Sequence, residues 1–175
     1  MASMTKSSST VYVDTSFFKA FLDPKDDFHD KALALWDSFH QQKTKLITTN
    51  YILDESFTLI RIRCTLPVAI KLRYLLYKYS AIIEIVRVEV EDEARVWEWF
   101  ENDWHHLSFT DCVSFAVMKR LELTDVATFD DHFARAGFTA LPNLTLDDDL
   151  SKAEQIDRKN IPKVEREITK AKTDL

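Results

Sequence analysis

The stretch Val11-Tyr12-Val13-Asp14-Thr15-Ser16-Phe17-Phe18 lies near the start of the chain and indicates its fold class. Three strand-favouring residues run directly into a carboxylate, and hydroxyl side chains and a second apolar run follow. A buried parallel strand reads as a short, continuous apolar run, and in open α/β sheets ligands bind at the carboxyl ends of such strands. We therefore expect Asp14 at the mouth of a crevice, with Ser16 free to cap the next helix. Taken alone, Asp14 is equally a turn or cap residue.

Further apolar runs predict four more strands, and helical spacing of apolar residues predicts helices between them. The strands are residues 45–49, 82–88, 125–129 and 138–141. The helices are residues 16–22, 26–42, one capped by Asn50, 67–80, 90–104, 108–122 and a short one that stops at Gly137. This alternation implies an α/β fold, in which a parallel sheet carries helices on both faces.

Composition limits the classes that remain. The 175 residues fit one domain plus a tail, and a single glycine argues against an all-β protein with its many tight turns. The net charge is −6, so the overall composition indicates no basic face for binding nucleic acid. No run approaches the length of a membrane span and the polar N-terminus is no secretory signal, so we expect a cytoplasmic protein that does not bind membranes. Cys64 and Cys112 are expected to be buried free thiols.

The predicted organisation has three parts. Residues 1–9 are expected to form a flexible N-terminus, residues 10–142 the α/β domain, and residues 143–175 a charged tail that is helical or disordered. The tail carries charges of both signs with few apolar residues, and its alternative role is to fold against a partner.

Four carboxylates recur at comparable places in this arrangement. Asp14 ends the first strand, Glu55 lies near the start of the helix after the second, and Asp130 ends the fourth. These three belong at the carboxyl edge of the sheet. Asp111 opens the helix before the fourth strand, where Ser108 and Asp111 resemble a capping box, and reaches that edge only if the loop at 104–108 carries it back.

Grouped carboxylates need cations. Two of them about 6 Å apart repel by about 3 kcal/mol at an effective dielectric constant near 20, so four together are unfavourable unless some are protonated or bound to ions. Oxygen ligands select Mg²⁺ or Mn²⁺, and the sequence has no Cys/His set with zinc spacing. Such ions orient water and stabilise charge during attack on a phosphodiester. The pattern therefore predicts metal-assisted phosphodiester hydrolysis.

The motifs at 13–16, 54–55, 108–111 and 128–133, followed by Gly137-Phe138, resemble PIN-domain ribonucleases, and most of all the toxins of VapBC toxin–antitoxin pairs. The resemblance covers residues 11–141 in order. It implies a three-layer α/β/α fold with a mostly parallel sheet and Mg²⁺- or Mn²⁺-dependent cleavage of RNA. It also implies a homodimer and a partner antitoxin that masks the site.

Carried over by position, the resemblance makes Asp14, Glu55, Asp111 and Asp130 the catalytic, metal-binding carboxylates. It makes Ser16 and Thr110 supporting residues that hold the site by hydrogen bonding. Two choices stay open on the residues alone, because Asp131 adjoins Asp130 and Asp54 adjoins Glu55, although a shift of one residue turns a side chain about 100° around a helix.

Other residues carry weaker predictions. The basic residues Arg61, Arg63, Lys71, Arg73 and Lys78 form either a solvated face or a local groove for RNA. His105 and His106 are either loop connectors or proton-transfer groups near Asp111. The alternative to an enzyme is a non-catalytic regulatory module, PIN-like or receiver-like. A receiver, however, needs a lysine at a late strand end, where this chain has Pro142.

Overall fold

The protein is described by a computed structural model over residues 10–143. The predictions of a flexible N-terminus at 1–9 and of a charged tail fall on residues 1–9 and 144–175, outside the described part, and the predicted domain boundaries stay a prediction.

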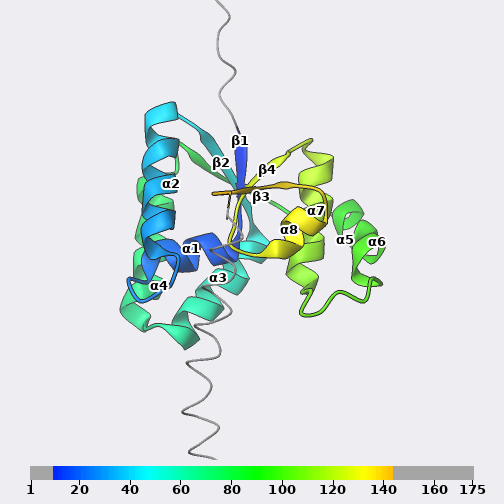
Figure 1. The fold of residues 1–175 in the computed structure, drawn as a ribbon, viewed down its shortest axis with the longest axis horizontal. Helices are drawn as coiled ribbons and strands as arrows, with labels where there is room; N and C mark the ends of the chain where they lie inside the picture. Colours follow the sequence, from blue (N-terminus) through cyan, green and yellow to red (C-terminus); the bar gives the residue numbers. More distant parts are fainter. Residues whose placement is uncertain (1–9, 144–175) are drawn as a thin grey trace, which may run out of the picture. The chain divides into compact units, whose positions relative to one another are not determined.

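A five-stranded parallel sheet forms the centre of the domain, as predicted (Figure 1). Its strands are β1 (Thr10–Val13), β2 (Lys45–Thr49), β3 (Ile83–Val86), β4 (Asp125–Ala127) and β5 (Thr139–Leu141), in the order β3-β2-β1-β4-β5. In the middle of the sheet Tyr12 pairs with Ile47 of β2 on one side and Val126 of β4 on the other. The carboxyl ends of β1 and β4 are therefore neighbours, and this brings Asp14 close to residues 128–130.

Helices cover both sides of the sheet. One side carries α1 (Thr15–Leu22), α2 (His29–Gln42), α3 (Asn50–Arg63) and α4 (Leu66–Lys78). The other carries α5 (Val90–Arg95), α6 (Trp97–Phe100), α7 (Phe109–Arg120) and α8 (Asp131–Arg135), as Figure 1 shows. Helix α1 packs against α2 and α3, and α7 packs against α5, α6 and α8. The predicted three-layer α/β/α fold is confirmed.

The core anchors α7 to the central strand. Residues 11–13 of β1 are buried, and the ring of Tyr12 is completely enclosed. Its hydroxyl donates to Oγ of Ser114 at 2.9 Å, and the Ser114 hydroxyl in turn donates to the carbonyl of Thr110 at 2.9 Å. Burial raises the pKa of Tyr12, so the group stays a neutral donor. These bonds tie β1 to the first turns of α7, which also carry Asp111.

Several predicted boundaries need correction. The helix predicted over 90–104 is two short helices, because the chain makes i to i+3 hydrogen bonds on both sides of the buried Val96. Helix α2 begins at His29 rather than at residue 26, because the Asp26 carboxylate accepts the N–H of Phe28 in a turn. The strands predicted over 82–88 and 125–129 are shorter, ending at Val86 and Ala127.

Two predicted caps are also wrong. Asp14, not Ser16, caps α1, since its carboxylate accepts the N–H of Ser16. Thr49, not Asn50, caps α3, and the Asn50 side chain instead accepts the N–H of Val88 beyond β3. The Gly137 prediction is confirmed, with φ of +93° directly after α8.

Helical spacing groups Ile70, Tyr74, Leu75 and Tyr77 as the expected apolar members of the helix predicted over 67–80, and the structure buries only one of these four. Leu75 is buried as expected, but Ile70, Tyr74 and Tyr77 are exposed, by 83% for Tyr77. The buried face is instead formed by Ala69, Leu72 and Leu75. Cys112 is buried and Cys64 half-buried, and both are free thiols.

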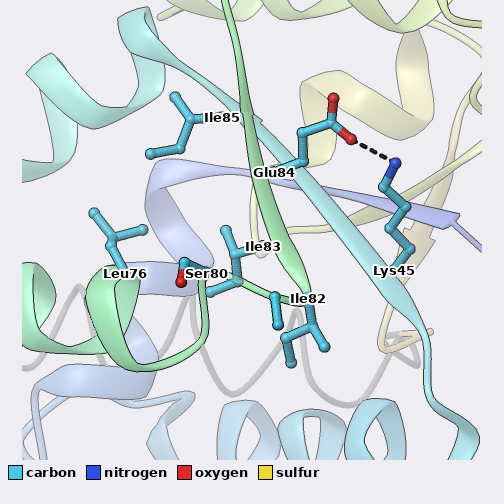
Figure 2. Close-up of a pocket in the computed structure, with 8 residues that line it drawn as sticks. Lys45, Leu76, Ser80, Ile82, Ile83, Glu84 and Ile85 are labelled. Carbon is cyan, nitrogen blue, oxygen red and sulfur yellow. Dashed lines mark ion pairs between the residues drawn. The ribbon is translucent and has the colours of Figure 1, made fainter.

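A pocket of about 480 Å³ lies beside the edge strand β3 (Figure 2). It is lined by Leu76, Ser80 and the residues that open β3, and Lys45 of β2 forms an ion pair with Glu84 at its rim. None of the four predicted site carboxylates is among its lining residues.

Candidate functional site

Asp14 is held rigidly between the ends of β1 and β4. It is 3% exposed, and its Oδ2 atom accepts hydrogen bonds from the Ser16 hydroxyl at 2.6 Å and from the Thr128 hydroxyl at 3.0 Å. The Ser16 oxygen also accepts the N–H of Phe129, so it bridges the two strand ends. Burial raises the pKa of Asp14, the charge of Asp130 raises it further, and the two hydroxyls oppose the shift.

Glu55 approaches Asp14 from the second turn of α3. Its Oε2 atom accepts a 2.6 Å hydrogen bond from Thr15, the residue after Asp14. Burial raises the pKa of Glu55, and the charges of Asp14 and Asp130 add to the shift. Asp54 is exposed on the turn of the helix beside it. The structure therefore brings Glu55, rather than Asp54, against Asp14.

Asp111 sits at the start of α7 in a complete capping box. Its Oδ2 atom accepts the N–H of Ser108 at 2.9 Å, and the Ser108 hydroxyl accepts the N–H of Asp111 at 3.0 Å. The carboxylate is 6% exposed. Burial, followed by the charges of Asp14 and Asp130, raises the pKa of Asp111 to about 7. The loop does bring Asp111 to the shared edge, which the order of elements alone left open.

Asp130 caps α8 directly after β4. Its Oδ1 atom accepts the N–H of His132 at 2.8 Å and lies 2.7 Å from the ring atom Nδ1 of the same residue. One possible ligand atom each of Asp111, Asp130 and His132 lie within 4.8 Å of one another. Asp131 is exposed and outside this group. The structure thus places Asp130, not Asp131, in the cluster.

The donor set fits a divalent cation. Four carboxylates come from four separate elements, and each of Asp14, Glu55 and Asp111 has a raised pKa to which the charges of its acidic neighbours contribute. A divalent ion relieves this repulsion, and hard carboxylate oxygens favour Mg²⁺ or Mn²⁺. With such an ion bound, the site can orient a water molecule and stabilise negative charge on a phosphodiester.

Thr110 lies on the rim of the cluster beside a second pocket. This pocket, of about 460 Å³, is lined by Asn50, Tyr51, Asp54, Arg87 and Thr110. Two of its lining residues, Asp54 and Thr110, directly precede Glu55 and Asp111 in the chain. The Thr110 carbonyl accepts the Ser114 hydroxyl, which ties this rim to the core.

His132 is the member of this site that sequence reasoning missed. It is 7% exposed, and its ring stacks parallel to Trp104 with centroids 6.4 Å apart. Its Nε2 atom lies 2.9 Å from the carbonyl oxygen of His105. The available signal was its place two residues after Asp130, in the first turn of a helix. The side chains of His105 and His106 are exposed in the loop.

A parallel sheet of this order with an acidic cluster at its carboxyl edge is an α/β domain with a candidate metal site. The sequence matches the family described as PIN domain over residues 11–139, and the protein belongs to this family.

Known proteins resemble the chain in sequence or in fold. The chain is 33% identical over 129 residues to the 23S rRNA-specific endonuclease VapC20 of Mycobacterium tuberculosis, covering 73% of this chain and 95% of that one. The crystal structure of that toxin, described as cleaving the sarcin–ricin loop, superposes with a TM-score of 0.65 and 32% identity, over 74% of this chain and 96% of the other. VapBC2 from Rickettsia felis, solved bound to a promoter DNA fragment, shares the fold with a TM-score of 0.57 at 12% identity, over 75% and 96% of the two chains.

Within residues 10–143, no helix combines the length and apolar character that crossing a membrane requires.

Proposed function

We propose that the protein is a VapC-type toxin, an endoribonuclease that hydrolyses RNA phosphodiester bonds with the help of Mg²⁺ or Mn²⁺. The observation that carries the proposal is the convergence of Asp14, Glu55, Asp111 and Asp130 at one edge of the sheet, where the charges of acidic neighbours contribute to the raised pKa of Asp14, Glu55 and Asp111. Such a cluster is stable in its charged form only with cations among its members. Its relation to a 23S rRNA-specific endonuclease supports ribosomal RNA as the first substrate to test.

In this proposal the four carboxylates hold the ion or ions and the surrounding hydroxyls fix the carboxylates. A bound ion would supply an activated water and would neutralise charge on the phosphate. Ser16 and Thr128 keep Asp14 in one rotamer, and Thr15 does the same for Glu55. Thr110 lines a pocket with Arg87, and in this proposal it supports the site from there and can contact the substrate.

The test is cleavage of purified ribosomal RNA with Mg²⁺, with Mn²⁺ and with EDTA. We expect cleavage only with a divalent ion, and no cleavage by Asp14→Asn or Asp111→Asn. The chain offers a matched control in a neighbouring exposed acid that lines neither pocket: Asp131→Asn should stay active where Asp130→Asn does not. Activity that survives EDTA, or survives Asp111→Asn, contradicts the proposal.

We also propose a partner antitoxin that masks the site and a homodimer of the toxin. Exposed apolar side chains on α3 and α4 support a protein contact there, since contiguous exposed apolar surface marks interaction sites. They are Ile62, Leu66, Ile70, Tyr74 and Tyr77. A cytoplasmic location stays a prediction of the sequence.

Light scattering after gel filtration tests the homodimer. The wild type should have twice the mass of one chain, and Tyr74→Lys with Tyr77→Lys should reduce it to one. Val90→Lys is the control, because Val90 is similarly exposed on α5 but lies outside this surface. A monomeric wild type at high concentration would contradict the homodimer without touching the nuclease proposal.

A further inference from the structure

The contact of His132 Nε2 with a carbonyl oxygen assigns one ring proton to that nitrogen. Its Nε2 atom lies 2.9 Å from the carbonyl oxygen of His105. A carbonyl oxygen only accepts hydrogen bonds, so Nε2 carries a proton and donates it. In the neutral imidazole the other nitrogen, Nδ1, then presents a lone pair. The ring is fixed in this orientation by its burial and by the parallel ring of Trp104.

That lone pair faces a carboxylate. Nδ1 lies 2.7 Å from Oδ1 of Asp130, which already accepts the N–H of His132. Among the residues that the structure describes, Nδ1 of His132 is the buried side-chain polar atom without a hydrogen-bond partner. Buried polar groups are nearly always paired, and an exception in a functional site calls for an unseen ion or proton.

We propose that Nδ1 of His132 is a nitrogen ligand of a divalent ion that it shares with Asp111 and Asp130. The ligand atoms of the three residues lie within 4.8 Å of one another. Octahedral ligands about 2.1 Å from an ion are about 3 Å apart when adjacent and about 4 Å apart when opposite, so small adjustments bring all three onto one ion. The inference rests on the proposed metal-dependent function and adds a ligand to it.

A nitrogen ligand has a consequence for metal choice. Mg²⁺ prefers oxygen ligands, whereas imidazole suits the first-row transition ions better. We therefore expect the protein to bind Mn²⁺ more tightly than Mg²⁺, and to lose this preference when the nitrogen is removed. Hydrogen bonding of Nε2 to the His105 carbonyl orients the ligand, as is usual for metal-bound histidines.

Electron paramagnetic resonance of the Mn²⁺-loaded full chain tests the ligand directly. A pulsed spectrum should show the coupling of a coordinated ¹⁴N nucleus, and growth with ¹⁵N-histidine should replace it by the ¹⁵N pattern. The exposed His106 supplies the control: His106→Gln should leave the coupling unchanged. This measurement on the wild-type protein decides the question even if a His132 variant fails to fold.

Two substitutions separate the ligand from the structural bond. His132→Gln places an amide near the Nε2 position, so it keeps the contact with His105 but has no atom at Nδ1. It should abolish the ¹⁴N coupling and weaken Mn²⁺ binding about ten-fold or more in calorimetry. His132→Asn places an amide oxygen near Nδ1. It should keep Mg²⁺ affinity within about three-fold while the preference for Mn²⁺ falls.

Failure of the inference that His132 is a ligand can be distinguished from failure of the proposed function. If wild-type protein binds Mn²⁺ and cleaves RNA without nitrogen coupling, a proton rather than the ion lies between Nδ1 and Asp130, and the inference is overturned while the nuclease proposal stands. If neither ion binds and RNA is not cleaved, the proposed function itself is wrong.

Discussion

Replacing Asp111 by asparagine should stabilise the metal-free protein at alkaline pH. The pKa of Asp111 is raised from 3.8 to about 7 in the folded state by burial and by its acidic neighbours. At about 1.4 kcal/mol per pKa unit, the charged carboxylate costs the folded state about 4 kcal/mol above pH 7. Asparagine removes the charge, and its amide oxygen can still accept the N–H of Ser108 and preserve the helix cap.

The sign of the pH dependence follows from proton binding. Between pH 4 and pH 7 the folded wild type holds a proton on Asp111 that the unfolded chain has released, so the wild type becomes less stable as pH rises through this window. The asparagine variant lacks this contribution. Its advantage over wild type should be near zero at pH 4 and about 4 kcal/mol at pH 8.

Urea unfolding in EDTA at the two pH values measures the effect. Adding saturating Mn²⁺ at pH 8 should raise the stability of wild type but leave Asp111→Asn nearly unchanged, since the substitution removes a ligand. Asp131→Asn, at an exposed acid in the first turn of α8, should show neither change. A difference between wild type and Asp111→Asn that is the same at pH 4 and pH 8 would refute the electrostatic account of the site.

Three further substitutions test separate parts of the structure. Thr15→Val removes a 2.6 Å hydrogen bond to a site carboxylate, and should cost about 1.5 kcal/mol in urea unfolding and lower kcat more than it changes KM. Arg120→Ala should destabilise the protein by about 3 kcal/mol, because it leaves the carboxylate of Asp92 without its bidentate partner. The Asp92 side chain is 1% exposed, so its charge would remain buried. The double substitution with Asp92→Asn should recover part of the lost stability. The double substitution Arg61→Ala and Arg63→Ala should reduce the slope of the logarithm of the RNA-binding constant against the logarithm of the salt concentration. The reduction should be about 0.7 for each phosphate that the two side chains neutralise. An unchanged slope would assign both residues to a solvated face.

The parts of the fold that are readable from sequence are those in which local pattern and burial agree. The β1 strand is buried on both faces, so its apolar run is continuous and points to a central parallel strand. Prediction failed on the outer face of α4, where Tyr74 and Tyr77 have helical spacing but lie exposed. Apolar periodicity identifies an apolar helix face. It does not show whether that face packs against the same chain or against a partner.

Long-range interactions hold the segment of α5 and α6 against α7. Asp92, near the start of α5, receives a bidentate ion pair from Arg120 at the end of α7, while Trp99 of α6 packs its ring against Phe115. Both interactions attach the segment to α7 at points far apart in sequence. The local spacing of Trp97 and Phe100 fits a single helix, and these long-range interactions could not be predicted from that spacing.

The residues of the site also differ in how far their placement could be predicted from the sequence. Asp14, Asp111 and Asp130 each accept a backbone N–H at a helix start, and the Ser108–Asp111 capping box was readable from local sequence, whereas the loop that brings Asp111 to the shared edge was not. His132 depends instead on the carbonyl of His105, which the fold brings to it from 27 positions earlier in the chain. Its closeness to Asp130 in the sequence was visible, but its orientation was not.

Capping also explains how the cluster is assembled without an ion to organise it. Each of the three aspartates uses one oxygen on a backbone N–H: Oδ2 of Asp14, Oδ2 of Asp111 and Oδ1 of Asp130. The positive end of a helix dipole favours a carboxylate at that place, which offsets part of the repulsion among them. In the hydrogen bonds of the described residues the opposite oxygen of each carboxylate has no partner, so it stays available to a ligand. A helix start thus fixes each side chain through one of its two carboxylate oxygens. For this reason Asp→Asn substitutions should disable metal binding here while leaving the fold intact.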